Sequence, residues 1–152
     1  MQWVIQMTFC SIEVGRLANG ACGPVTTNIF GKSDTQTPMI SKITQGDLAC
    51  GKGPVVSYAP AVQLNLNKLI IETAEKNNIP FQRQASSRST GTDTDAFAYS
   101  NDGVVSALIS LPLRYMHTTV EMIHKEDVEN VIQLIYESLL VIKNGQDFKY
   151  LK

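Results

Sequence analysis

The sequence predicts an α/β domain in which helices flank a mixed, mostly parallel sheet. Three observations lead to this prediction. A helical pattern after Pro60 lies between two strand-like segments, a nearly continuous apolar run at residues 104–113 is typical of a strand buried on both faces, and a long amphipathic segment then extends to about residue 143. Strands that alternate with helices favour a layered α/β architecture. The 152 residues are enough for one such domain.

The first 53 residues are expected to form short strands and loops. Residues 1–10 alternate loosely between apolar and polar side chains, which suits a strand. Residues 11–53 are rich in Gly, Ser, Thr and Asn, and their weak periodicity is typical of loops and short strands. The run Gly51-Lys52-Gly53-Pro54 indicates a turn, and a short strand is expected after it at residues 55–58.

The middle of the chain has a sharper pattern. Apolar residues recur at helical spacing between residues 62 and 77 and predict a helix there. Asn77-Asn78 ends this helix, because the following Ile79-Pro80 cannot easily continue it. Residues 81–85 alternate as a strand would, and the polar segment Ser86 to Asp95 predicts a loop.

The last two elements are the clearest. Residues 104–113 (VVSALISLPL) are apolar and β-branched at their start, which predicts the buried strand. A helix is expected from about Lys125, since the acidic Glu126 and Asp127 are favourable at a helix N-terminus. Its apolar stripe consists of Val128, Val131, Ile132, Ile135, Leu139 and Ile142.

Composition excludes several classes of function. With 43% hydrophobic and 18% charged residues, the chain is predicted to fold rather than to be disordered. Its net charge is −1 and it has no basic run, so we expect no nucleic-acid partner. No apolar stretch approaches the roughly 20 residues that cross a bilayer, so we expect no membrane partner. Cys10, Cys22 and Cys50 form no C-x-x-C pair, which favours reduced thiols and a cytoplasmic location.

A histidine follows directly on the predicted buried strand, in the segment Arg114-Tyr115-Met116-His117. Sheets of this class place their ligands beyond the carboxyl ends of the strands. His117 can present one ring nitrogen to a metal and donate from the other to a neighbouring oxygen, or it can be a hydrogen-bonded structural residue. His124, just before the last helix, is expected to be a surface or cap residue.

Other polar residues near this segment also have two interpretations. Arg114 can orient a carboxylate, or it can form a salt bridge with Glu121. Asp93 and Asp95 can border a pocket, although turn formation alone would also explain them.

The run Gly91-Thr92-Asp93-Thr94-Asp95-Ala96-Phe97, followed by Ser106 to His117, resembles a pair of motifs in one family. These are the dinuclear-metal aminopeptidases, which include glutamyl, deblocking and tetrahedral aminopeptidases and some proteins once labelled endoglucanases. The resemblance extends from about Asp34 to Ile142 and implies the C-terminal half of a three-layer, zinc-peptidase-like catalytic domain. It implies that His117 binds a metal and that Asp95 borders the substrate pocket. Arg114 is a second candidate for substrate binding, because its guanidinium can orient a carboxylate.

Two upstream segments resemble further landmarks of this family. Ser11-Ile12-Glu13-Val14-Gly15 is similar to the family's Gln-Glu-Glu-Val-Gly, which implies Glu13 as a metal ligand and puts Ile12 at the position of the general base. The segment that begins Asp34-Thr35 resembles one that follows a metal-binding aspartate by about four residues, and Phe30 stands at that place. The family's other ligands, a histidine and a bridging aspartate, are expected from outside this chain.

The resemblance implies a metal-dependent aminopeptidase with two zinc or cobalt ions, peptide substrates and a homo-oligomeric assembly. Ile12 and Phe30 favour an alternative, a truncated or diverged inactive fragment that acts at most as a structural or assembly module. We expect a single, partial catalytic domain in which residues 1–33 are atypical, 34–143 are family-like and 144–152 form a tail.

Overall fold

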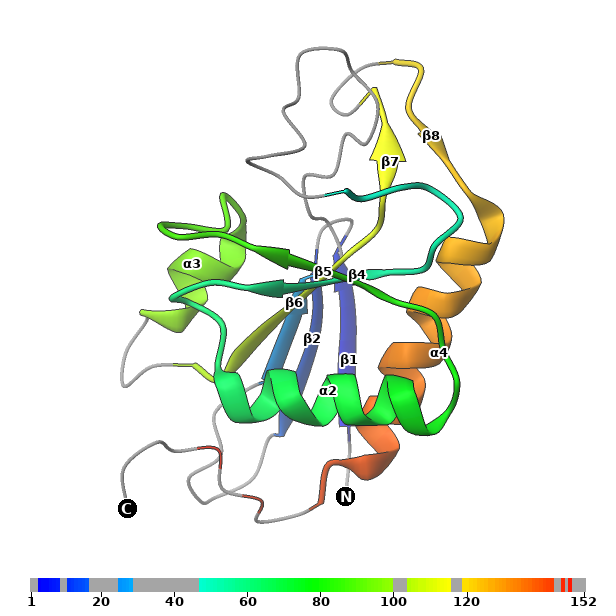
Figure 1. Cartoon of the computed structure of the whole chain (residues 1–152). Helices are drawn as coiled ribbons and strands as arrows, with labels where there is room; N and C mark the ends of the chain where they lie inside the picture. The colour runs from blue at the N-terminus through cyan, green and yellow to red at the C-terminus, as the bar shows by residue number, and fades with distance from the viewer. Residues whose placement is uncertain are drawn as a thin grey trace.

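A mixed sheet runs through the centre of the chain, with helices packed against it (Figure 1). The computed structural model describes residues 47–99, 104–115, 119–143, 146 and 148, together with the backbone of residues 3–8, 11–16 and 25–28. The strands are β1 (Trp3–Thr8), β2 (Ser11–Arg16), β3 (Val25–Asn28), β4 (Val55–Tyr58), β5 (Gln82–Ala85), β6 (Ser106–Ser110), β7 (Leu113–Arg114) and β8 (Met122–Ile123). The helices are α2 (Leu64–Lys76), α3 (Asp93–Ala98) and α4 (Lys125–Val141).

The strand order of the main sheet is β1-β2-β3-β6-β4-β5, and β7 and β8 form a separate two-stranded sheet. The prediction of a mixed α/β sheet is confirmed. Among the described strands, however, parallel pairing joins β3 to β6 and β4 to β5, whereas β1–β2, β2–β3 and β4–β6 are antiparallel. The sheet is therefore less parallel than predicted. One reason is local, because β1 and β2 follow each other closely in the chain and strands so joined pair as an antiparallel hairpin.

Helix α2 confirms the helix expected between residues 62 and 77. Its N-cap is Gln63, whose side-chain oxygen accepts a hydrogen bond from the Leu66 amide at 2.6 Å. At the other end Asn78 has a φ of 54°, and the Ile79 amide donates to the Ala74 carbonyl at 2.9 Å. An asparagine in this left-handed conformation, followed by that bond, terminates a helix. The predicted stop at Asn77-Asn78 is thus confirmed.

Strand β6 is buried along its whole length, as predicted for residues 104–113. Ala107 and Ile109 belong to the hydrophobic core beside α2 and α4, and the alternate residues, including Leu108, are buried as well. The predicted strand does not run straight to residue 113, because it is interrupted at Pro112, which has no amide hydrogen to donate to a ladder.

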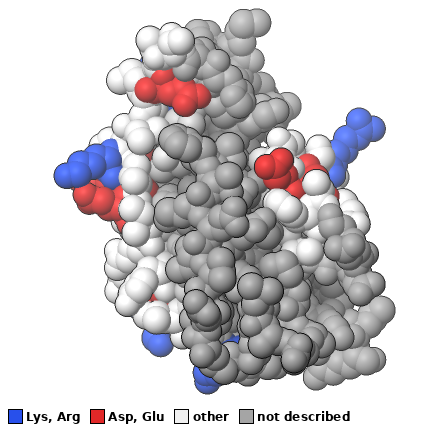
Figure 2. Space-filling view, turned by 180° about the vertical axis from the view of Figure 1, so that it is seen from behind, with Lys and Arg blue, Asp and Glu red and all other residues white. Residues whose placement is uncertain are grey.

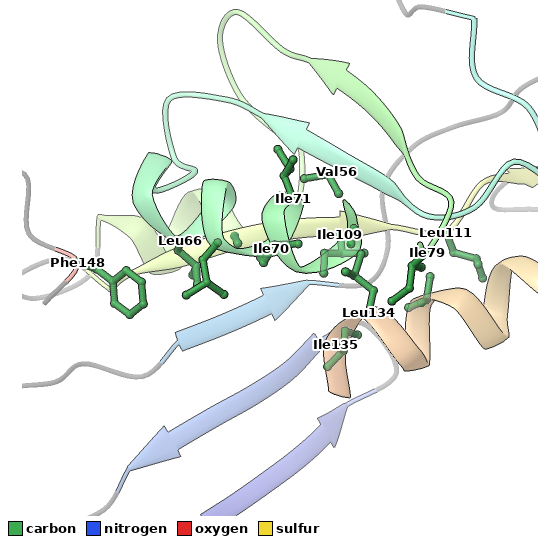
Figure 3. Close-up of a cluster of buried hydrophobic side chains, with 14 residues drawn as sticks. Val56, Leu66, Ile70, Ile71, Ile79, Ile109, Leu111, Leu134, Ile135 and Phe148 are labelled. Atoms are coloured by element: carbon green, nitrogen blue, oxygen red, sulfur yellow. The ribbon is translucent and has the colours of Figure 1, made fainter. Parts of the chain in front are cut away.

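The core therefore lies between the sheet and the α2–α4 pair (Figure 3). Its residues are Val56, Leu66, Leu69, Ile70, Ile71, Ala74, Ile79, Ala107, Ile109, Leu111, Val131, Leu134, Ile135 and Phe148.

Two predictions of local structure need correction. The segment Ser86 to Asp95 is not a loop throughout, since α3 begins at Asp93 after the N-cap residue Thr92. The acidic residues that suggested a turn are also favourable in the first turn of a helix. The pairing of β7 with β8 was not predicted either, and α4 ends at Val141, slightly before the expected residue 143.

The described charged side chains lie in small, separate groups on the face seen in Figure 2, and the groups at its left and right edges contain both signs. Among the helices of the described ranges, none has the length and apolar character needed to span a membrane.

Candidate functional site

The segment that contains His117 connects the short strands β7 and β8. Leu113 pairs with Ile123 and Arg114 with Met122. In Figure 1 these strands stand above the main sheet, beside the start of α4. His117 lies outside the described residues, and Tyr115 and Thr119 are its nearest described neighbours in the chain. The segment therefore follows β7 of the small sheet, and not directly the buried strand β6 as the sequence predicted.

Arg114 is held by its neighbour Tyr115. The guanidinium carbon lies 5.2 Å from the centre of the Tyr115 ring, and Nη2 donates to the Tyr115 hydroxyl at 3.3 Å. Among the interactions between described residues, Arg114 makes this contact and no ion pair with Glu121. Tyr115 itself has a φ of 58°, a conformation that is uncommon for a non-glycine residue and that turns the chain sharply at this point.

Asp95 fastens the loop that resembles the family's Thr-Asp-Ala motif. Its two carboxylate oxygens accept hydrogen bonds from the backbone amides of Thr90 at 3.0 Å and Gly91 at 2.9 Å. Asp93, in the same first turn of α3, is exposed. Since α3 contacts β3 and β6, this loop is placed beside the central strands. Asp95 therefore shapes the loop, and its half-buried carboxylate still has lone pairs for a further donor.

Three buried polar atoms in this region have no hydrogen-bond partner in the described structure. They are Thr94 Oγ1 in α3, Ser110 Oγ at the end of β6, and Arg114 Nε in β7. Buried polar groups nearly always have a hydrogen-bond partner. An unpaired group in a candidate site is therefore available to bind a ligand or a water molecule. Two of the three belong to the segments that carry the predicted substrate contacts.

Asp127 makes a long-range link that the sequence did not reveal. Its side chain is fully buried, and its oxygens accept hydrogen bonds from the Gly51 amide at 2.6 Å and the Gly53 amide at 2.7 Å. The loop before β4 is thereby tied to the first turn of α4. His124, the N-cap of α4, lies beside this loop, because a Cβ added to Gly51 would lie 3.7 Å from its ring.

The same loop is fastened from a second side by Gln82 of β5. The Gln82 amide nitrogen donates to the carbonyls of Ala49 and Gly53, each at 2.9 Å, and its oxygen accepts from the Ala49 amide at 2.8 Å. Gly53 also passes so close to Pro80 that an added Cβ would lie 2.0 Å from the Pro80 carbonyl oxygen. The predicted turn at Gly51 to Pro54 is therefore a rigid support under the start of α4.

Of the two predicted metal ligands, His117 lies outside the described residues, and the structure describes the backbone of Glu13. Glu13 lies in β2, where it pairs with Thr26 of β3, and β3 separates this strand from β6. Ile12 is the preceding residue of β2, and Phe30 lies outside the described residues. Within the described side chains, no group of three or more His, Cys, Asp or Glu residues could hold a metal ion. The described part of the chain does not by itself supply a metal-binding donor set.

The protein is an α/β domain with a mixed sheet. Its candidate site lies beyond the end of the central buried strand β6. The model of the M42 glutamyl aminopeptidase family matches residues 28–134. The chain belongs to this family. The match includes both motifs and the segment at Asp34.

Relatives and solved structures agree with this assignment. The lysyl aminopeptidase of Pyrococcus furiosus is 42% identical over 98 residues, which are 64% of this chain and 28% of that protein. A TET aminopeptidase from a marine sediment archaeon of the Thaumarchaeota has a TM-score of 0.62 at 26% identity and is matched over 74% of this chain and 31% of its own. The TET1 peptidase of Pyrococcus horikoshii, which can assemble into a tetrahedron or a large octahedral shell, has a TM-score of 0.53 at 32% identity, over 66% of this chain and 29% of its own. The chain thus spans less than a third of each of these proteins.

Proposed function

We propose that this chain forms part of the catalytic site of a metal-dependent aminopeptidase, which hydrolyses the N-terminal peptide bond of peptides. The observation that carries the proposal is the family match over residues 28–134, which includes both the loop at Asp95 and the segment at His117. The 42% identity to a lysyl aminopeptidase supports the same reaction class.

The proposed metal ligands on this chain are His117 and Glu13, and the ion is zinc or cobalt, both of which accept mixed nitrogen and oxygen ligands. A bound ion would activate a water molecule and polarise the scissile carbonyl. Two ligands do not complete a two-metal site, so the remaining ligands and the general base, whose position is occupied by Ile12, are proposed to come from outside this chain.

Asp95 and Arg114 are the proposed substrate contacts. The Asp95 carboxylate can attract the positively charged amino terminus of a peptide while it holds the Thr90 and Gly91 amides. The buried Arg114 Nε lacks a partner among the described residues, and it can donate to a carboxylate or a carbonyl oxygen. We further propose a homo-oligomer, by analogy with the TET1 relative that assembles into shells. A cytoplasmic location is proposed from the cysteines, which form no C-x-x-C pair.

The alternative function is that of an inactive fragment, a structural or assembly module. Two features of the sequence favour it, namely Ile12 at the position of the general base and Phe30 at the place of a metal-binding aspartate. The two functions differ in whether this chain binds metal with a defined stoichiometry.

Metal content and turnover of the 152-residue chain distinguish the two functions. The chain is loaded with zinc or cobalt, its bound metal is measured, and hydrolysis of an aminoacyl reporter substrate is followed with cobalt added. The chain has two histidines, so His124→Ala is a matched control for His117→Ala. Stoichiometric metal and turnover that are lost in His117→Ala and kept in His124→Ala support the peptidase site. Substoichiometric metal that neither substitution changes contradicts His117 as a ligand and supports the fragment. Absence of turnover alone does not distinguish the two functions, because the remaining ligands and the general base are proposed to come from outside this chain.

A further inference from the structure

The segment that carries His117 lies between two short strands. It follows β7, which the buried Leu111 and Pro112 join to β6, and it precedes β8. The chain then passes from β8 through His124 directly into α4. The position of β8 above the main sheet therefore depends on its pairing with β7 and on the first turn of α4.

Strand β8 has little packing of its own. Its two residues, Met122 and Ile123, are 56% and 54% exposed, so burial contributes little to holding it in place. Its pairing with β7 comprises the two pairs Leu113–Ile123 and Arg114–Met122. A two-stranded ribbon is marginally stable at best on its own in water. The first turn of α4 must therefore supply much of what fixes β8.

Asp127 fixes the first turn of α4 to the main sheet. Its fully buried carboxylate accepts from the amides of Gly51 and Gly53, and Gly53 lies just before β4. Its own amide donates at 3.1 Å to the carbonyl of His124, the residue that follows β8. In Figure 1 the loop before β4 passes beside this turn. Hydrogen bonds through Asp127 thus connect the main sheet to the end of β8.

We propose that Asp127 is a positioning residue for the candidate site. Its carboxylate sets the place of β8, and β8 sets the place of Arg114 through the pair Arg114–Met122. The inference rests on the proposed function, in which Arg114 contacts the substrate. Asp127 itself touches no substrate and acts through α4 and β8. A shift of about 1 Å in a substrate contact, caused by a distant substitution, can weaken catalysis about a hundredfold.

Amide hydrogen exchange tests whether Asp127 holds the two short strands. Asp127→Asn keeps one oxygen, which can accept from one of the two loop amides, so part of the link remains. Loss of one hydrogen bond to a charged group should speed exchange in β7 and β8 by about tenfold more than in β6. Ile71→Val removes one core methyl group from α2 and is the control of similar global destabilisation. It should not speed exchange selectively in β7 and β8.

Binding of a dipeptide tests the role of Asp127 in the site. Alanyl-alanine is titrated into the chain and followed by NMR, because its amino terminus and carboxylate fit the proposed contacts Asp95 and Arg114 without a metal. Asp127→Asn should raise the dissociation constant by about tenfold. In an Arg114→Ala chain the same substitution should raise it no further, since the contact that Asp127 positions is already gone. Ile71→Val, which acts on stability alone, should leave the dissociation constant unchanged.

Unchanged exchange in β7 and β8 of a folded Asp127→Asn chain, or equal acceleration in Ile71→Val, overturns the positioning role. Equal dipeptide affinity of the parent chain and Asp127→Asn also overturns it, while the proposed function stands. A parent chain that binds no dipeptide contradicts the proposed contacts Asp95 and Arg114, and the positioning role is overturned with them. If circular dichroism shows that Asp127→Asn does not fold, Gly51→Ala, which strains the same loop, replaces it in both measurements.

Discussion

Two aspartates in this chain make the same kind of contact in different settings. Asp127 and Asp95 each accept hydrogen bonds from two backbone amides with their two carboxylate oxygens. Asp127 is fully buried and binds amides 76 and 74 residues away, at 2.6 and 2.7 Å. Asp95 is half-buried and binds amides 5 and 4 residues away, at 3.0 and 2.9 Å.

The difference shows which aspartate supports the fold and which shapes a loop. Without Asp127, two amides of a closely packed loop lose their acceptor where water has little access, and a buried donor left unpaired is costly. Without Asp95, water can reach the two amides and replace part of the lost interaction. We therefore expect the start of α4 and the loop before β4 to form a rigid support, and the loop before α3 to be adjustable.

The largest effect is expected from Asp127→Ala. Removal of the acceptor from two buried amides should lower the free energy of unfolding by about 3–5 kcal/mol. Urea denaturation followed by circular dichroism measures this change. Glu126→Ala is the matched control, because Glu126 is an exposed acid in the same first turn of α4, and its removal should cost no more than about 1 kcal/mol. Equal losses in the two variants would mean that Asp127 acts only through its charge at the helix N-terminus.

The second prediction concerns the two glycines that Asp127 holds. Both have positive φ angles, 82° at Gly51 and 87° at Gly53, so alanine is strained at either position. At Gly53 the added Cβ would also meet the Pro80 carbonyl oxygen at 2.0 Å, whereas at Gly51 the nearest atom is 3.7 Å away in the His124 ring. Gly53→Ala should therefore lower the free energy of unfolding by about 2–4 kcal/mol, and Gly51→Ala by about 1 kcal/mol.

Denaturant midpoints of the two alanine variants, measured side by side, separate packing from backbone strain. A loss at Gly53 no larger than that at Gly51 would show that the loop before β4 can move away from Pro80. The loop before β4 would then be less rigid than we infer from the buried hydrogen bonds of Asp127.

Local patterns in the sequence were sufficient for most of the fold. Helix α2 and its stop at Asn78 were predicted because periodicity and the helix-ending residues act over a few positions. Strand β6 was predicted because it is buried on both faces and hence continuously apolar. The strands β7 and β8 were not, because two-residue strands carry no periodicity. Helix α3 was missed because the same acidic residues favour a turn and a helix N-terminus.

Less of the candidate site could be predicted from local patterns in the sequence. The hydrogen bonds of Asp95 stay within its own loop, and the sequence indeed suggested a turn there. Asp127 and Gly51 were each noticed, one as a helix-start residue and the other as part of a turn, but their contact depends on how distant segments pack. The assignment of His117 and Glu13 as metal ligands comes from motif resemblance, and it stays a prediction.

The smallest effect, and the most informative one for function, is expected from Asp95→Ala. The loss of two hydrogen bonds at a half-buried site should lower the free energy of unfolding by about 1 kcal/mol, and Asp93→Ala, at an exposed position of the same turn, by less. If Asp95 also binds the amino terminus of the substrate, Asp95→Ala should raise KM in a chain that shows turnover far more than Asp93→Ala does. Asp95→Asn removes the negative charge but keeps one oxygen, which can still accept from one of the two loop amides. A KM that Asp95→Asn leaves unchanged would confine Asp95 to shaping the loop.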